Sequence, residues 1–267
     1  VINQDDEEIV AQQLLQRYGF DGKVRKDASP FNFSRKCNLG VAHASGHILV
    51  FLNDDIDLQT VGWTSHVISL LQEENVACVG AMLMNTDRTV QSCGDNVGRS
   101  SAVHYAPEPS PSHVGDAMHR YIADHESTSV TGAFLCCRRD TFKTLNGFSL
   151  AFPNSFQDVD FCLRARNQGS RCIISPHVKI IHFESVSRNP VVDDVTLLMI
   201  RDLHKPLIAP YDSYALFLYE KPKVPLFTLT AGIYFLSRIK QFLIKAYCLM
   251  GVYVRQGPSY PPFITPD

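Results

Sequence analysis

Three carboxylates follow an apolar run early in the sequence and indicate a cation site. Residues 47–52 form the run, and Asn53, Asp54, Asp55 and Asp57 come after it. Such a run is typical of a strand buried on both faces, and ligands of open α/β sheets bind beyond the carboxyl ends of their strands. Clustered carboxylates repel one another unless a cation lies between them. Their hard oxygen atoms suit Mg²⁺ or Mn²⁺, ions that hold substrate phosphates.

The same acidic segment has a second interpretation. Asp57 or Thr60 would cap the helix that the following residues predict, and the acidic loop would then be structural. This segment by itself leaves both interpretations open.

A second pair of carboxylates opens a predicted helix near residue 157. Asp158 and Asp160 lie in its first turn, where the helix dipole stabilises negative charge. One of them is a candidate general base for a hydroxyl group. The alternative is ordinary helix capping, with Asp160 and Arg164 paired one turn apart.

A third polar segment follows a predicted strand and begins at His182. His182 would supply a nitrogen ligand to the same cation, and Arg188 would pair with a phosphate group. The alternative is a structural histidine at a strand end. Zinc is set aside, because the spacing of Cys172, His177 and His182 does not match ordinary zinc sites.

Predicted strands and helices alternate along the first 190 residues, which indicates an α/β sheet with crossover connections. The predicted helices span 5–18, 34–45, a segment from Thr60 to about Leu71, 139–145 and 157–168. The predicted strands span 47–52, 76–84, 89–93, 130–137, 171–175 and 178–183. We expect two parts: a catalytic domain over 1–190 and a helical, proline-rich appendage over 191–267.

Composition excludes several classes of protein. The chain has 267 residues, of which 45% are hydrophobic, and this content excludes disorder over most of its length. A net charge of −2 gives no field for nucleic acid, so no nucleic-acid partner is expected. The eight cysteines include no C-x-x-C pair, which favours free thiols in a reducing compartment. The acidic opening residues do not resemble a signal peptide, and we expect a cytoplasmic protein.

The C-terminal residues 224–254 carry an apolar stripe at helical spacing. A helix packed on the catalytic domain is the favoured interpretation. The alternative is a surface helix that holds the protein peripherally on the cytoplasmic face of the membrane.

Several short motifs follow one another along the chain: PFNFS (30–34), NLG (38–40), FLNDD (51–55), TGA (131–133), NGF (146–148), QDVDFCLR (157–164) and HFESVSR (182–188). Together they resemble glycosyltransferase family 2, and most closely its rhamnosyltransferase-like members with the GT-A fold. The resemblance covers about residues 1–189, and its strength lies in the order and spacing of the motifs.

The resemblance implies a mostly parallel GT-A sheet flanked by helices, and an inverting, metal-dependent glycosyltransferase. Such an enzyme moves a hexosyl or rhamnosyl group from a nucleotide-diphospho-sugar to a hydroxyl of a glycan or lipid-linked acceptor, in polysaccharide synthesis. The metal would be Mg²⁺ or Mn²⁺.

The resemblance also assigns roles to individual residues. Asp55 and His182 would bind the metal, and Asp158 would be the catalytic base. Donor and diphosphate contacts would come from Asn38, Asn53, Asp54 and Arg188, and acceptor or sugar contacts from Thr131, Gly132, Ala133 and Asp160. Two residues depart from the family pattern, because Asn53 replaces the commoner Asp of the D-x-D motif and Gln157 replaces a Glu.

The family begins with a strand and a turn that hold the nucleotide base, and no segment here matches them. Residues 1–3 look like the second strand of the family. This difference supports a rival from another class, a truncated transferase-like module that binds without catalysis. A nucleotidyltransferase is a second rival, but no basic phosphate-binding loop is visible near the start.

Overall fold

The computed structural model describes residues 5–97, 102–104, 120–183 and 194–204. The chain divides into two compact units, and every described residue belongs to the unit made of residues 1–210 and 262–267. The described elements are α1 (Asp5–Tyr18), α2 (Phe33–His43), β1 (Ile48–Leu52), β2 (Ile56–Leu58), α3 (Trp63–Leu71), β3 (Val76–Met84), β4 (Val90–Ser92), β5 (Asp95–Val97), β6 (Ala102–His104), β7 (His125–Ser127), β8 (Phe134–Arg138), α4 (Arg139–Thr144), α5 (Gln157–Asn167), β9 (Arg171–His182) and α6 (Asp194–Leu203). The predictions for residues 1–3, Arg188 and 224–254 lie outside the described residues.

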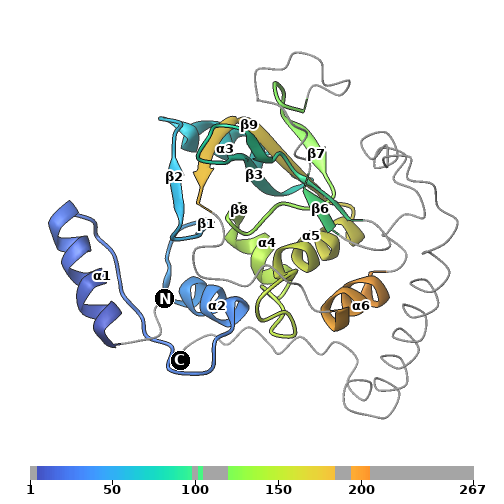
Figure 1. The fold of residues 1–267 in the computed structure, drawn as a ribbon. Coiled ribbons are helices and arrows are strands. Elements are labelled where there is room, and N and C mark those ends of the chain that lie inside the picture. Colours follow the sequence, from blue (N-terminus) through green and yellow to red (C-terminus); the bar gives the residue numbers. More distant parts are fainter. Residues whose placement is uncertain (1–4, 98–101, 105–119, 184–193, 205–267) are drawn as a thin grey trace, which may run out of the picture. The chain divides into compact units, whose positions relative to one another are not determined.

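A seven-stranded sheet forms the centre of the described unit (Figure 1). Its main path is β1-β8-β3-β9-β2, with β4 paired to β3 and β7 paired to β9. A separate two-stranded sheet joins β5 to β6. The carboxyl end of β1 therefore lies beside the start of β8, and β2 lies beside the end of β9.

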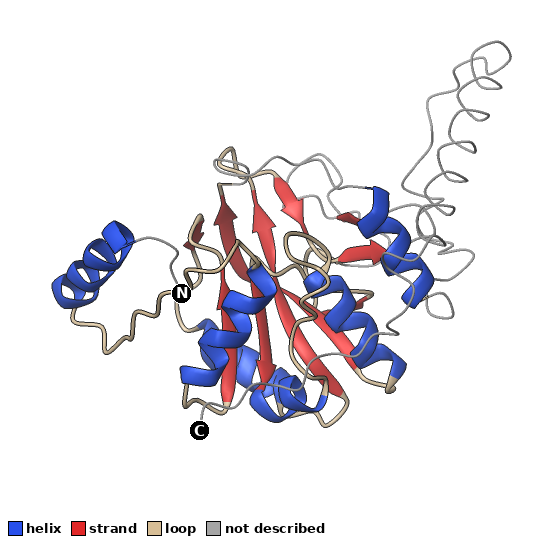
Figure 2. Cartoon of the chain, turned by 90° about the horizontal axis from the view of Figure 1, so that it is seen from below, coloured by secondary structure: helices blue, strands red, loops and turns tan. Residues whose placement is uncertain are grey.

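Helices cover both faces of the sheet, as Figures 1 and 2 show. Strand β8 contributes side chains to the core on both faces, because successive side chains of a strand point to opposite faces of the sheet. Leu135 and Cys137 join the core cluster that contains residues of α2, α4 and α5. Phe134 and Cys136 join the cluster under α3. The predicted α/β class, with a helix-flanked sheet, is confirmed.

The prediction of a mostly parallel sheet is wrong. Among the described strand pairs, β3 with β9 is parallel and the other pairs are antiparallel. All nine residues of β3 are buried, so its sequence is a continuous apolar run. A strand covered by helices on both faces has this composition whichever way its neighbours run, and composition therefore does not report direction.

Most predicted helices and strands are found close to their predicted bounds, with two instructive differences. The predicted strands at 171–175 and 178–183 are one strand, β9, whose register against β3 shifts near Ala81. The predicted cap at Thr60 is also absent, because α3 begins after Gly62, which has a φ of 73°. The Thr60 hydroxyl instead donates to the carbonyl of His177 and accepts from the backbone N–H of Lys179.

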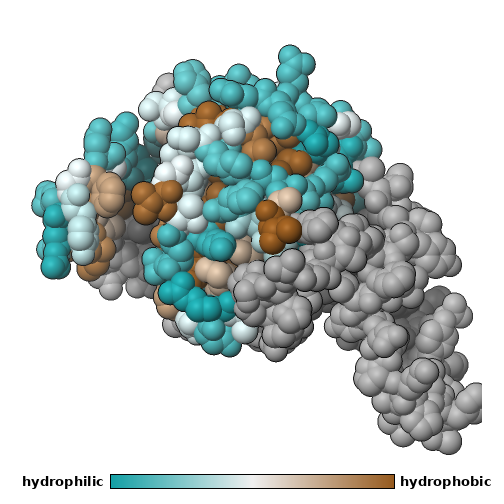
Figure 3. Space-filling model, turned by 90° about the horizontal axis from the view of Figure 1, so that it is seen from above, coloured by the Kyte–Doolittle hydropathy of each residue, from teal (hydrophilic) through white to brown (hydrophobic). Residues whose placement is uncertain are grey.

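The visible surface mixes hydrophilic and hydrophobic residues without one continuous apolar face among the coloured atoms (Figure 3). None of the helices in the part of the chain that the structure describes has both the length and the hydropathy for a membrane span.

Candidate functional site

The turn after β1 brings the first acidic segment to the end of β9. The backbone N–H of Asn53 donates to the carbonyl of Ala133, 3.1 Å away, at the start of β8. Three residues later Ile56 pairs with His182, and the N–H of Phe183 donates to the carbonyl of Asp55 at 2.9 Å. These backbone contacts place Asp55 beside His182, although 127 positions separate them.

Asp55 and His182 face each other without a hydrogen bond between them. The Oδ1 atom of Asp55 lies 3.2 Å from Nε2 of His182, and the two side chains are 27% and 10% exposed. This Oδ1 atom is buried and has no hydrogen-bond partner. A buried carboxylate oxygen without a donor is costly, so the pair is suited to a cation that both residues bind.

The other nitrogen of His182 is held by Gln91 of β4. Nδ1 lies 2.7 Å from Oε1 of Gln91, an oxygen that can only accept a hydrogen bond. Nδ1 therefore donates to this oxygen, and Nε2 is the ring nitrogen that faces Asp55. The side-chain amide of Asn53 also faces Nε2, at 3.4 Å. One imidazole nitrogen and one carboxylate oxygen fit a divalent metal ion.

Asp158 lies in the first turn of α5 and is held by two backbone donors. Oδ2 accepts from the N–H of Gly132 at 2.6 Å, and Oδ1 accepts from the N–H of Val159 at 2.9 Å. Burial raises the pKa of the Asp158 carboxyl, the nearby charge of Asp95 raises it further, and the two N–H groups oppose the rise. The pKa of the half-buried carboxylate is therefore shifted in the direction that favours proton acceptance.

The two parts of the site share one short backbone segment. Ala133 accepts from Asn53, and the adjacent Gly132 donates to Asp158. The structure thus brings Asp55, His182 and Asp158 to the region where β1 ends and β8 begins. Thr131 precedes this segment, and its carbonyl accepts from the N–H of Phe134. Asp54 is exposed at the turn.

Asp160, predicted to contact the sugar or acceptor, does not reach the site. Its side chain is fully buried, with Oδ2 2.8 Å from a guanidinium nitrogen of Arg164 and Oδ1 2.9 Å from Nε2 of His204. The alternative of an ion pair with Arg164, one helical turn away, is the observed arrangement. The physical reason is α5 itself, which turns Asp160 toward the core while Asp158 faces the segment at Gly132.

Asn38, predicted to contact the diphosphate, is hydrogen-bonded to the backbone of Phe148. Its side-chain amide donates to the carbonyl of Phe148 at 2.8 Å and accepts from the N–H of the same residue at 3.0 Å. Both ends of the amide are used, and they tie α2 to the loop after α4. Its contact with the diphosphate stays a prediction.

Sequence reasoning missed two residues that shape the site. Gln91 lies in a predicted strand, but no local pattern links it to a histidine 91 positions away. Asp95 is buried and accepts from the hydroxyl of Ser129 at 2.8 Å, and its charge acts on Asp158. The signal that would have identified Asp95 is its burial, and the sequence does not show which carboxylates are buried.

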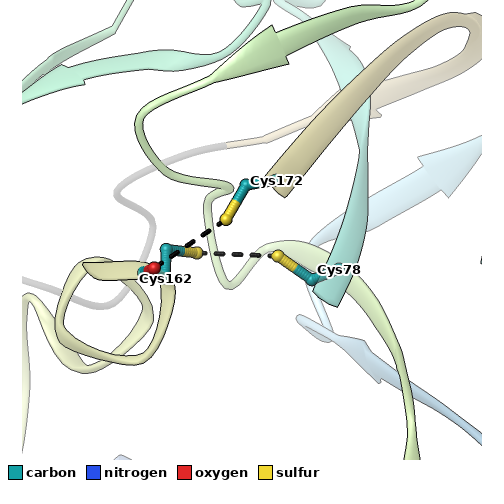
Figure 4. Close-up of side chains that lie close together, drawn as sticks. All are labelled: Cys78, Cys162 and Cys172. Carbon is teal, nitrogen blue, oxygen red and sulfur yellow. Dashed lines mark hydrogen bonds between the residues drawn. The ribbon is translucent and has the colours of Figure 1, made fainter. Parts of the chain in front are cut away.

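A second cluster of potential ligands lies in the core behind the site. The sulfur atoms of Cys78, Cys162 and Cys172 come from β3, α5 and β9 and lie within 4.8 Å of one another, all fully buried (Figure 4). Hydrogen bonds to the other two thiols, together with burial, raise the pKa of Cys78 well above its usual value, and burial raises that of Cys162. Cys162 is one turn after Asp158, so the cluster anchors the helix that carries this carboxylate.

Known proteins resemble this chain in sequence and in fold. No family model matches the chain. The chain is 31% identical over 173 residues to the uncharacterized protein y4gI of Sinorhizobium fredii and 31% identical over 166 residues to the O-antigen biosynthesis protein RfbC of Myxococcus xanthus. These matches cover 64% and 60% of this chain, and the chain spans 19% and 12% of the relatives.

Among solved structures, GalNAc-T7 with UDP, GalNAc and Mn²⁺ resembles the chain with a TM-score of 0.59 and 12% sequence identity. The match covers 94% of this chain and 50% of that one. At this identity the likeness concerns the fold. The described unit, a mixed sheet between helical layers with the site beyond β1, has the GT-A fold of glycosyltransferases.

Proposed function

We propose that this protein is a metal-dependent glycosyltransferase that moves a sugar from a nucleotide-diphospho-sugar to an acceptor hydroxyl. The observation that carries the proposal is the buried, unbonded Oδ1 of Asp55, 3.2 Å from Nε2 of His182, beside the segment that holds Asp158. The GT-A fold and the relative named for O-antigen biosynthesis support the reaction class.

Asp55 and His182 are the residues that would hold the metal ion, Mg²⁺ or Mn²⁺. The solved structure of GalNAc-T7 contains Mn²⁺, which supports a divalent ion. When bound, such an ion offsets the negative charge that develops on the departing diphosphate. Asn53 lies against the same imidazole nitrogen. With Asp54 in the same turn, and with Arg188, it would contact the ribose and diphosphate of the donor.

Asp158 would act as the general base. Its carboxylate accepts the proton of the acceptor hydroxyl as that oxygen attacks the anomeric carbon from the face opposite the diphosphate. One displacement inverts the configuration at this carbon. General-base catalysis contributes roughly 10²–10⁴-fold to a rate. The N–H groups of Gly132 and Val159 hold the two carboxylate oxygens in place before the acceptor arrives.

The segment 131–133 would line the acceptor side of the site, since its backbone contacts both Asp158 and the turn after β1. The acceptor is then a glycan or lipid-linked saccharide of polysaccharide synthesis, at the cytoplasmic face of the membrane. The relative named for O-antigen biosynthesis supports this acceptor class.

The test measures donor binding and sugar transfer separately on the full chain. We expect Mn²⁺-dependent calorimetric binding of at least one nucleotide-diphospho-sugar from a panel. Asp55→Asn should weaken that binding, whereas Asp158→Asn should retain it and lose transfer by 10²-fold or more. The Asn variants are matched, since each removes one negative charge with little change in volume.

Two outcomes would contradict the proposal. Full transfer by Asp158→Asn would remove that residue from the role of base. Absence of binding at millimolar donor and Mn²⁺ would support the rival, a transferase-like module without catalysis.

A further inference from the structure

The turn between β3 and β4 contains a chain of polar side chains that ends at His182. It starts at Asp87, whose carboxylate can only accept hydrogen bonds. The Thr89 hydroxyl donates to Oδ1 of Asp87 at 2.6 Å, and the Thr89 N–H donates to the same oxygen at 3.0 Å. These two bonds lower the pKa of Asp87, so it is a carboxylate at neutral pH.

The hydrogen bond from Thr89 to Asp87 determines which group donates in the next two hydrogen bonds. Because the single hydroxyl proton of Thr89 is given to Asp87, its Oγ1 must accept from Asn85, whose Nδ2 lies 2.9 Å away. The side-chain oxygen of Asn85, Oδ1, therefore faces Gln91 and accepts from the Nε2 of Gln91 at 3.2 Å. The same Nε2 lies 3.4 Å from the carbonyl of His182, which also requires a donor on this side of Gln91.

The orientation of the Gln91 side-chain amide determines which of its atoms faces the imidazole of His182. With its Nε2 toward two acceptors, its Oε1 must face Nδ1 of His182, 2.7 Å away. Only a protonated Nδ1 can donate to that oxygen. On the other side of the ring the amide of Asn53 points at Nε2, which agrees with a lone pair there.

We propose that this relay of four residues, Asn85, Asp87, Thr89 and Gln91, sets the tautomer of His182, with Gln91 as the positioning residue that presents the Nε2 lone pair beside Asp55. The inference deepens the proposed function, and its link to the metal rests on that function. A ring protonated at Nε2 would direct an N–H group at the position of the cation and could not bind it. The relay prevents this state because its far end is a carboxylate that never donates.

The backbone of the turn brings the relay residues together. The Asn85 N–H donates to the Thr89 carbonyl at 2.9 Å, and the Arg88 N–H donates to the Asn85 carbonyl at 3.0 Å. Arg88 has a left-handed φ of 71°, which closes the turn tightly enough for the side chains at 85 and 89 to meet. β4 then pairs with β3 and carries Gln91 to His182.

The test compares Gln91→Met with Gln91→Glu. Met has a similar length but only a weakly accepting sulfur, whereas Glu keeps the accepting oxygen. Nitrogen-15 NMR of the imidazole in the metal-free protein reports which nitrogen carries the proton. We expect the Nδ1–H form in the wild type and in Gln91→Glu, and a mixture of forms in Gln91→Met. Loss of such an outer partner of a metal ligand weakens metal binding by about 10–100-fold, and we expect this for Mn²⁺ in Gln91→Met.

A second variant tests the far end of the relay. Thr89→Val keeps the shape of the side chain but removes the hydroxyl that orients Asn85, so a smaller shift toward the Nε2–H form is expected. An unchanged melting temperature and circular dichroism spectrum serve as the check that each variant is folded.

The outcomes separate this inference from the proposed function. A folded Gln91→Met protein with the wild-type tautomer and wild-type Mn²⁺ affinity would overturn the relay. A wild type with the Nδ1–H form that binds no Mn²⁺ would support the relay's effect on the ring and contradict the proposed metal site.

Discussion

The chemistry of the site depends on how single side chains are balanced by their surroundings. Asp158 is the clearest case, because burial and the charge of Asp95 raise its pKa while two backbone N–H groups lower it. The net effect is a raised pKa. A base of this kind binds a proton more readily than an exposed Asp.

The pH dependence of transfer should report this balance. Asp158 must be ionised to accept a proton, so kcat should fall as the pH drops through its raised pKa, above the ordinary 3.8. Asp95→Asn removes the like charge and should move this acidic limb to lower pH. A pH profile of kcat for both proteins is the measurement. An acidic limb that stays in place in a folded Asp95→Asn protein would contradict the coupling of the two carboxyls.

Gly132 is a second position where a small change in one side chain should affect Asp158. A Cβ on this residue would lie 3.3 Å from Oδ2 of Asp158 and would press on the carboxylate. We expect Gly132→Ala to lower kcat by about tenfold or more, because small displacements of a catalytic group are costly. Mn²⁺ affinity should be unchanged, since Asp55 and His182 do not contact this Cβ position. A wild-type kcat would mean that the segment gives way without moving Asp158.

At the scale of elements, α5 positions the base through contacts on its buried side. The three sulfur atoms of Figure 4 anchor the middle of the helix. Asp160 pairs with Arg164 within α5 and joins the helix to His204, the residue after α6. Ile200 of α6 packs in the same apolar cluster as Val159. These contacts hold the first turn of the helix against the segment 131–133.

The buried ion pair of α5 should be sensitive to loss of one partner. Arg164→Met leaves the fully buried Asp160 without its guanidinium, and a loss of about 3–5 kcal/mol in the free energy of unfolding is expected. Arg166→Met is a matched control on the same helix, because its partner Glu126 is 45% exposed, and it should cost about 1 kcal/mol or less. Denaturant unfolding measures both. Equal losses in the two variants would contradict the importance of burial.

Across the whole protein, the proposed metal site would join segments that are far apart in the chain, so an ion bound there should stabilise the folded state. At a Mn²⁺ concentration 100 times the Kd the gain is about 2.7 kcal/mol, which corresponds to a rise of roughly 5–10 °C in the melting temperature. Asp55→Asn should abolish most of this rise. A melting temperature that does not respond to Mn²⁺ or to a chelator would argue against the site.

Much of the local structure could be predicted from the sequence, because it depends on neighbours in the chain. The periodicity of 5–18 and 157–168 predicted helices that the structure contains, and the apolar run of 76–84 predicted β3. The carboxylates after β1 and at the start of α5 were identified as candidates in the same way. The strand directions were not predictable, since residues buried between helices have the same composition in either direction.

Local patterns along the chain show where the reactive residue types lie: Asp55 just after a strand, Asp158 in the first turn of a helix and His182 at a strand end. Which of these side chains meet depends on tertiary packing. It joined His182 to Gln91, 91 positions earlier, and turned Asp160 into the core while Asp158 reached Gly132. The physical reason is that burial and long-range hydrogen bonds arise from the packing of the sheet, which spacing along the chain does not encode.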